Sequence, residues 1–144
     1  MTQKFFNTTL TVFDEEDSDF AAKPELFTVA NHVAHVAGTV HWFVEGAFGK
    51  GWDMDFETHE THAREITSLD DAKAQLEEAF AAAIKTIGEA SDQELCEPIP
   101  DKQIMEGAPR CSIVSAISDH TAHHRGALSV YARLLGKVPT MPYA

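Results

Sequence analysis

The chain has 144 residues, 44% of them hydrophobic, which is enough for one domain with a core of its own. Its 11 basic and 23 acidic residues give a net charge of -12, which repels phosphate backbones and anionic membranes. We therefore expect a single domain over residues 1–144 that binds neither nucleic acid nor membrane. No apolar run approaches the ~18 residues of a membrane span, and the N-terminus does not resemble a signal peptide, so we expect a cytoplasmic protein.

Two helices are expected in the first third of the chain. Phe5, Phe6, Leu10 and Phe13 follow helical spacing in residues 2–13, and an acidic run at residues 14–19 ends this block. Residues 25–48 follow Pro24 and carry one apolar stripe before a group of glycines. The stripe consists of Val29, Val33, Val36, Val40 and Phe43.

Two more helices are expected in the rest of the chain. Residues 49–68 are polar and aromatic and predict a long loop with at most one helical turn, of the kind that often borders a site. Ser68 is a suitable cap for a third helix that runs to about residue 90. After a connector rich in proline, residues 111–135 form the fourth helix, which ends before Gly136 and Pro139. Because no segment alternates with a period of two, we expect an all-α four-helix bundle.

Eight histidines direct attention to a metal, because neutral imidazole is the commonest transition-metal ligand. His120 and His124 continue the apolar stripe of the fourth helix and lie one above the other, so both nitrogens can reach one ion at ~2.0–2.1 Å. Two readings compete with this one: a register that uses Asp119 and His123, and a pair of ordinary histidines at the edge of the core.

A third ligand is expected from the second helix, because metal sites in bundles are assembled from facing helices. The helical wheel favours His32, which lies closer to the valine stripe than His35 does. The second flank of the same helix, with His35, Thr39 and Trp42, could instead face the fourth helix while the valines face another neighbour. Periodicity leaves both histidines open.

Several segments are familiar from one protein family. Residues 34–37 (AHVA), 42–43 (WF), 120–126 (HTAHHRG) and 133–139 (RLLGKVP) together resemble the DinB-like (damage-inducible) family over essentially the whole chain. The resemblance implies an up-down-down-up four-helix bundle with a three-histidine metal site. The family's ligand on helix two is a histidine followed by a small apolar pair and, two turns later, an aromatic residue. His35 and Trp42 match this pattern, so the implied ligands are His35, His120 and His124.

The same resemblance supplies expectations about function. It implies a divalent transition metal, either zinc, nickel or iron, in an enzyme that acts as a thiol (S-) transferase or hydrolase on a small molecule such as a low-molecular-weight thiol. The alternative is a non-catalytic metal-binding protein, stress-associated or devoted to interactions. Ala127 stands where many members have glutamine, which weakens inference of the substrate. No acid lies within the HxxxH as in zinc proteases, so no general base can be named.

The remaining expectations concern residues around the site. Trp42, Trp52 and Tyr131 are expected in the core or along a pocket, and Arg125 either binds an anionic substrate or pairs with an acid. His59 and His62 are assigned no role. A homodimer is expected because the short first helix leaves apolar surface uncovered, unless the aromatic segment 52–56 folds back over the bundle.

Overall fold

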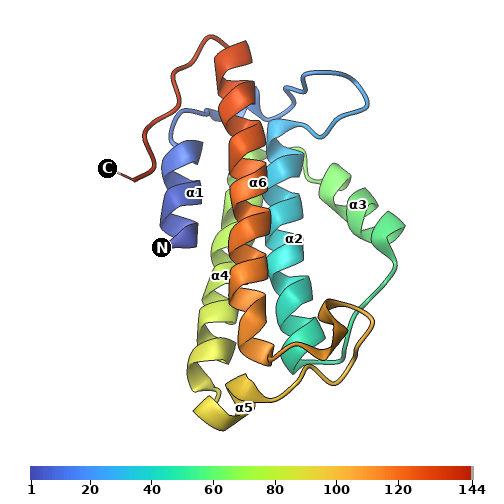
Figure 1. Ribbon diagram of the computed structural model, residues 1–144. Coiled ribbons are helices and arrows are strands. Elements are labelled where there is room, and N and C mark those ends of the chain that lie inside the picture. Colours follow the sequence, from blue (N-terminus) through green and yellow to red (C-terminus); the bar gives the residue numbers. More distant parts are fainter. Residues whose placement is uncertain (144) are drawn as a thin grey trace.

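The computed structural model describes residues 1–143, which fold as a helical bundle (Figure 1). Within this range β-structure is limited to one isolated bridge between Pro98 and Pro109. The expectation of an all-α bundle is confirmed. Its long helices are α2 (Val29–Phe48), α4 (Leu69–Glu89) and α6 (Ile113–Leu134), and the shorter ones are α1 (Thr2–Leu10), α3 (Phe56–Glu65) and α5 (Asp92–Cys96). Over the described residues, no helix is both long enough and apolar enough to cross a membrane.

Helix α2 is the central element of the bundle, since it packs against α3, α4 and α6, whereas α1 packs against α6. In Figure 1, α1 and α6 run upward and α2 and α4 run downward. Two parallel neighbours such as α2 and α4 need a connection that returns along the length of the bundle. Residues 49–68 make that connection, with α3 in the middle of it.

The two flanks of α2 have different partners. Its most extensive packing is against α4, and the four valines of its stripe are at most 1% exposed (Val29, Val33, Val36 and Val40). His32 and His35 lie on another flank, where they contact His124 and His120 of α6. The valine stripe and the histidines therefore lie at different interfaces of the same helix. This agrees with the interpretation in which the flank with His35 faces the last helix while the valines face another neighbour.

Helix α2 begins at Val29 and not at residue 25, because Thr28 and Asn31 form a capping box. The Thr28 hydroxyl accepts from the Asn31 backbone N–H at 3.1 Å, and the Asn31 side-chain oxygen accepts from the Thr28 N–H at 3.1 Å. The amide nitrogen of Asn31 donates to the carbonyls of Ala63 and Ile66 at 3.1 and 2.9 Å. One buried side chain thus starts α2 and ends α3.

The long loop expected at residues 49–68 is wrong in one respect, because it contains the ten-residue helix α3. This helix has no apolar stripe, since Ala63 is its one buried residue, and it therefore gave no periodic signal. Asp55 caps its N-terminus by accepting from the Thr58 N–H at 3.1 Å, and Glu60 pairs with Arg64 one turn later. Local polar contacts, rather than burial, define this helix.

The acidic run that follows α1 forms a short 3-10 turn at Glu15–Asp17 with specific contacts. Ser18 Oγ accepts from the Leu69 N–H at 2.9 Å and Glu15 Oε2 accepts from the Asp70 N–H at 2.8 Å, so this turn satisfies donors at the start of α4. Lys137 pairs with Asp14 and Asp17 and holds the segment after α6 against the same turn.

The double role of Asn31 can be tested with the substitution Asn31→Asp. A carboxylate keeps the acceptor for the Thr28 N–H but loses both donors to the α3 carbonyls, which are buried with it. We expect the free energy of unfolding to fall by about 1–3 kcal/mol, the cost of unsatisfied buried polar groups. Urea titration followed by circular dichroism measures this change. The exposed Gln93→Glu, which adds the same charge, serves as the control, and equal effects of both variants would contradict the assignment.

Candidate metal centre

Three histidines meet where α2 crosses α6. One ring nitrogen from each of His35, His120 and His124 can be chosen so that all lie within 4.8 Å of one another. His120 and His124 are one turn apart on α6, with ring centroids 4.6 Å apart, and the His35 ring lies 5.0 and 4.8 Å from theirs. The residues that the sequence named as candidate ligands are therefore neighbours in space. Whether they bind an ion stays a prediction.

The distances suit a transition metal. His35 Nε2 and His120 Nε2 are 3.2 Å apart. Two nitrogens bound at about 2.0–2.1 Å to a tetrahedral ion lie about 3.3–3.4 Å apart, so this pair needs almost no movement to share one. The cluster of described residues contains no carboxylate or thiol, and three neutral imidazoles leave a fourth coordination position for another molecule. The donor set fits zinc, nickel or iron without a decision among them.

His32, the alternative ligand, has a different place in the structure. Its Nδ1 lies 2.9 Å from Nδ1 of His124, and its ring packs edge-on against Phe27 and Tyr131. When Nδ1–H of His124 donates to Nδ1 of His32, the lone pair of His124 lies on Nε2, which can then bind an ion. Partners of this kind fix the tautomer and the ring orientation of metal-binding histidines. His32 therefore fixes the orientation of the His124 ring, a candidate ligand.

Burial keeps the histidines neutral, the form in which imidazole binds metals. Desolvation, followed by repulsion from neighbouring histidines, lowers the pKa of His124 to about 2 and the pKa values of His32 and His120 to about 4. Desolvation also lowers the pKa of His35, against the opposing effect of Glu60. Proton competition for these nitrogens is thus reduced at neutral pH.

The other candidates on α6 lie elsewhere. Asp119 and His123 are exposed and lie outside the three-histidine cluster. Arg125 donates to the Tyr143 hydroxyl at 2.9 Å, and its guanidinium lies over the rings of Phe5 and Tyr143. Among the residues that the structure describes, Arg125 has no acidic partner, and its role as an anchor for an anionic substrate stays a prediction.

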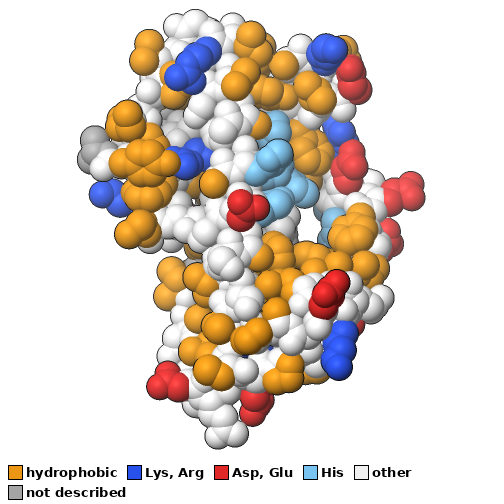
Figure 2. All heavy atoms as spheres, in the orientation of Figure 1, with side chains coloured by type: hydrophobic (Ala, Val, Ile, Leu, Met, Phe, Trp, Pro, Cys, Tyr) orange, Lys and Arg blue, Asp and Glu red, His pale blue; other side chains and the backbone are white. Residues whose placement is uncertain are grey.

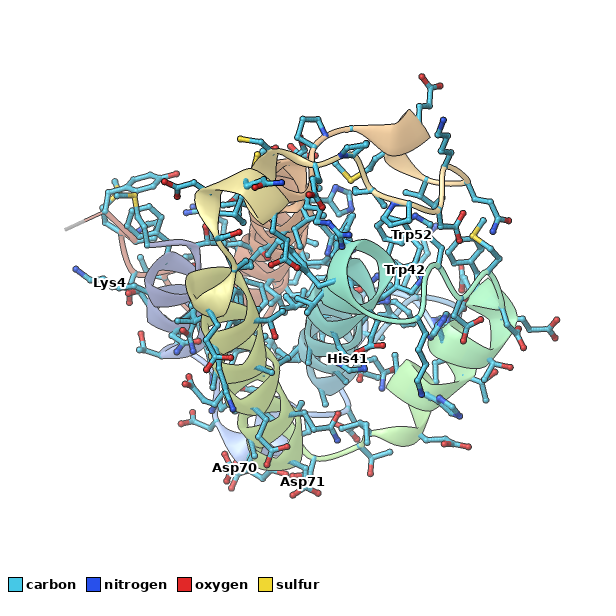
Figure 3. The ribbon with its side chains drawn as sticks, turned by 90° about the horizontal axis from the view of Figure 1, so that it is seen from below. Lys4, His41, Trp42, Trp52, Asp70 and Asp71 are labelled. Atoms are coloured by element: carbon cyan, nitrogen blue, oxygen red, sulfur yellow. The ribbon has the colours of Figure 1, made fainter. Side chains whose placement is uncertain are left out.

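A cavity of about 990 Å³ adjoins the cluster and lies between α2 and α3. His35 and His120 form part of its wall, and aromatic residues form another part, among them Phe27, Trp42, Phe43 and Phe56. Figure 2 shows histidine side chains at the surface beside a hollow flanked by hydrophobic residues. In Figure 3, Trp42 and Trp52 lie together between α2 and α3, and their ring centroids are 4.6 Å apart. Of the aromatic residues singled out earlier, Trp42 lines the cavity, whereas Trp52 and Tyr131 are buried.

Two polar residues on the opposite wall of the cavity were not predicted from the sequence to belong to the site. His59 and Glu60 of α3 line the cavity, and Glu60 is close enough to His35 to affect its pKa. The Nε2 atom of His59 is buried without a hydrogen-bond partner, and the closest carboxylate oxygen, from Asp53, is 3.5 Å away. Asp55 as a cap and the Glu60–Arg64 spacing were the available signals for a helix here.

A family model described as the DinB family matches residues 2–144. The chain belongs to the DinB family. The resemblance inferred from the motifs is therefore confirmed over essentially the full chain. No curated protein matches this DinB chain in sequence, so its activity has to be argued from its own residues.

Substitution of single histidines separates ligands from their supports. We expect His35→Ala, His120→Ala and His124→Ala each to abolish stoichiometric metal binding in this DinB protein, because each removes a nitrogen from the cluster. His32→Ala removes only the partner of His124 and should weaken binding by about tenfold. Metal content after dialysis, with circular dichroism to verify folding, measures both effects. The exposed His41→Ala is the control, and a larger effect of His32→Ala than of His35→Ala would reverse the assignment.

The low pKa of buried His32 also predicts how the metal-free protein responds to acid. Between about pH 6.5 and 4 the unfolded chain binds a proton at His32 that the folded chain does not, so the free energy of unfolding falls as the pH falls. One such group contributes up to about 1.4 kcal/mol per pH unit. Urea titrations at several pH values in the presence of a chelator should therefore give a shallower dependence for His32→Phe than for the wild type. The same dependence in both would contradict a neutral, buried His32.

Proposed function

We propose that this DinB protein is a metal-dependent enzyme that binds a divalent transition metal through His35, His120 and His124 and transfers a thiol to a small electrophile. The observation that carries the proposal is that His35 and His120 belong both to the three-histidine cluster and to the wall of the cavity. A cluster that served only to join two helices would have no need of an adjoining chamber. When bound, the ion would favour the deprotonated form of a thiol or water molecule that reaches it from the cavity.

The chain provides groups that can accept the proton. Glu60 and His59 lie on α3, across the cavity from the cluster, and neither side chain is fully buried. One Glu60 oxygen pairs with Arg64 at 2.9 Å, which orients the carboxylate. The imidazole of His59, which also lines the cavity, is a second candidate. A general base within reach of the reacting group is what the HxxxH segment itself does not supply.

The cavity also provides the surroundings for the reaction. Trp52 is 6% exposed, and its ring packs at a tilt against that of Trp42, so buried aromatic surface lies behind this wall of the cavity. The apolar wall next to the cluster can pack against the organic part of a thiol substrate, and for this reason we favour thiol transfer over hydrolysis.

Reconstitution tests the proposal. Metal-free protein is loaded with zinc, nickel, iron or cobalt and supplied with mercaptoethanol and chlorodinitrobenzene. In the expected reaction a C–S bond forms and the C–Cl bond breaks, chloride leaves, and the thiol proton passes through Glu60 or His59 to solvent. We expect turnover by the loaded wild type and none by His120→Ala. Glu60→Gln should keep its metal content but react about a hundredfold more slowly, the lower end of the range for loss of a general base.

The controls distinguish an enzyme from a protein that only binds a metal. His62→Gln alters another polar residue of α3 that lines the cavity and should keep the wild-type rate. Stoichiometric metal without any effect on the rate would favour the non-catalytic alternative. The absence of metal from every preparation would reject the proposal as a whole.

A further inference from the structure

The wall of the cavity next to the cluster contains an unusual residue for the middle of a helix. Gly38 lies one turn after His35 on α2 and lines the same cavity. A Cβ atom added there would meet no other atom within 4 Å. Nearly every other residue favours a helix more than glycine does, and packing does not demand glycine here. Its effect is to leave space beside the histidines.

The aromatic wall offers little to a polar ligand. The ring centroid of Trp42 lies 5.1 Å from that of Phe43 and 5.8 Å from that of Phe56, in edge-to-face arrangements. The indole N–H of Trp42 donates to the Asp53 carbonyl at 2.7 Å, which satisfies its one polar atom and fixes the ring. Phe56 is 53% exposed at the edge of the cavity. These rings present apolar surface to whatever enters.

The charges around the cavity are unfavourable for anions. Four acidic residues line it (Glu45, Asp53, Glu60 and Glu65), and Lys50 is the single lysine or arginine among the lining residues that the structure describes. The guanidinium of Arg64 is held by Glu60 at 2.9 Å and by the Glu25 carbonyl at 3.1 Å. Arg125, the anion anchor suggested by the sequence, is engaged with Tyr143. A carboxylate or phosphate would therefore find no free guanidinium here.

We propose that this cavity selects a ligand with an aromatic body and no negative charge, with its metal-binding head group next to His35 and His120 and its ring between Gly38 and Trp42. The selection rests on the proposed function in so far as the head group binds the ion. Acidic side chains and the net charge of -12 exclude anionic thiols from the same position.

A matched pair of thiols tests the selection, namely benzyl mercaptan and para-carboxybenzyl mercaptan, which differ by one carboxylate. Two readouts are used on the full chain. The two tryptophans, Trp42 at the wall and Trp52 against it, report binding by fluorescence in the metal-free protein. In cobalt-loaded protein, the near-ultraviolet charge-transfer band produced by sulfur coordination reports where the head group lies. We expect benzyl mercaptan to bind about tenfold more tightly than its carboxylated partner, as one unpaired charge next to fixed acids requires.

Glycine variants locate the ligand. Gly38→Leu fills the space beside His35 and should weaken benzyl mercaptan at least about tenfold. It should leave cobalt content and the binding of the smaller mercaptoethanol unchanged. Gly88→Leu is the matched control, since Gly88 is also helical, exposed and free of neighbours within 4 Å, but lies on α4 outside the cavity. Both substitutions favour the helix, so loss of folding is not the expected consequence of either.

The outcomes separate this inference from the proposed function. Equal affinity for the two thiols, or identical behaviour of Gly38→Leu and Gly88→Leu, would overturn the inference even if cobalt binds and thiols react. Failure of the wild type to bind cobalt would reject the metal site, and the fluorescence titration of metal-free protein would then decide alone whether the cavity prefers the uncharged aromatic ligand.

Discussion

Burial of imidazoles at the contact between α2 and α6 is the constraint on which the other features of this protein depend. His32 and His124 are at most 9% exposed, and they are joined to each other by a hydrogen bond within the bundle. Buried polar groups without partners are costly, and charged ones are more so. The histidines therefore have to stay neutral and to satisfy one another, or else share an ion. Both conditions bring ring nitrogens of α2 and α6 close together.

As a result, the faces of α2 have different roles. The valine face packs against α4 and contributes hydrophobic stabilisation, which leaves the histidine flank free to be polar. The same helix then carries Gly38 and Trp42 on the side that lines the cavity. A chain of this length can bury an adequate core without a metal, so a site within the bundle need not be part of what folds it. An ion bound there would then be available for chemistry.

Periodicity predicted the long helices and the pair His120 and His124, because these features depend on local sequence. The helical wheel favoured His32 as the third ligand, and His35 was implied only by the resemblance to the family. Both histidines lie near α6 and differ in what they touch: His32 contacts His124, and His35 contacts His120 as well. Helix α3 escaped prediction because caps and one ion pair define it, with almost no buried surface. The connection between α2 and α4 places α3 beside the site, and no local sequence pattern encodes the course of this connection. His59 and Glu60 were therefore not predicted as residues of the site.

Asn31 has a consequence for how a molecule reaches the cluster. At one end α3 is fastened to α2 by this amide, and near the other end the indole of Trp42 bonds the Asp53 backbone. A segment pinned at both ends behaves as a fixed span rather than as a hinged lid. The distance between these two attachment points then sets the width of the cavity. A molecule enters between α3 and the rest of the bundle, without an opening movement of α3. Adaptation to larger or smaller molecules would proceed by exchange of side chains along the inner face of α3, while the anchors stay in place.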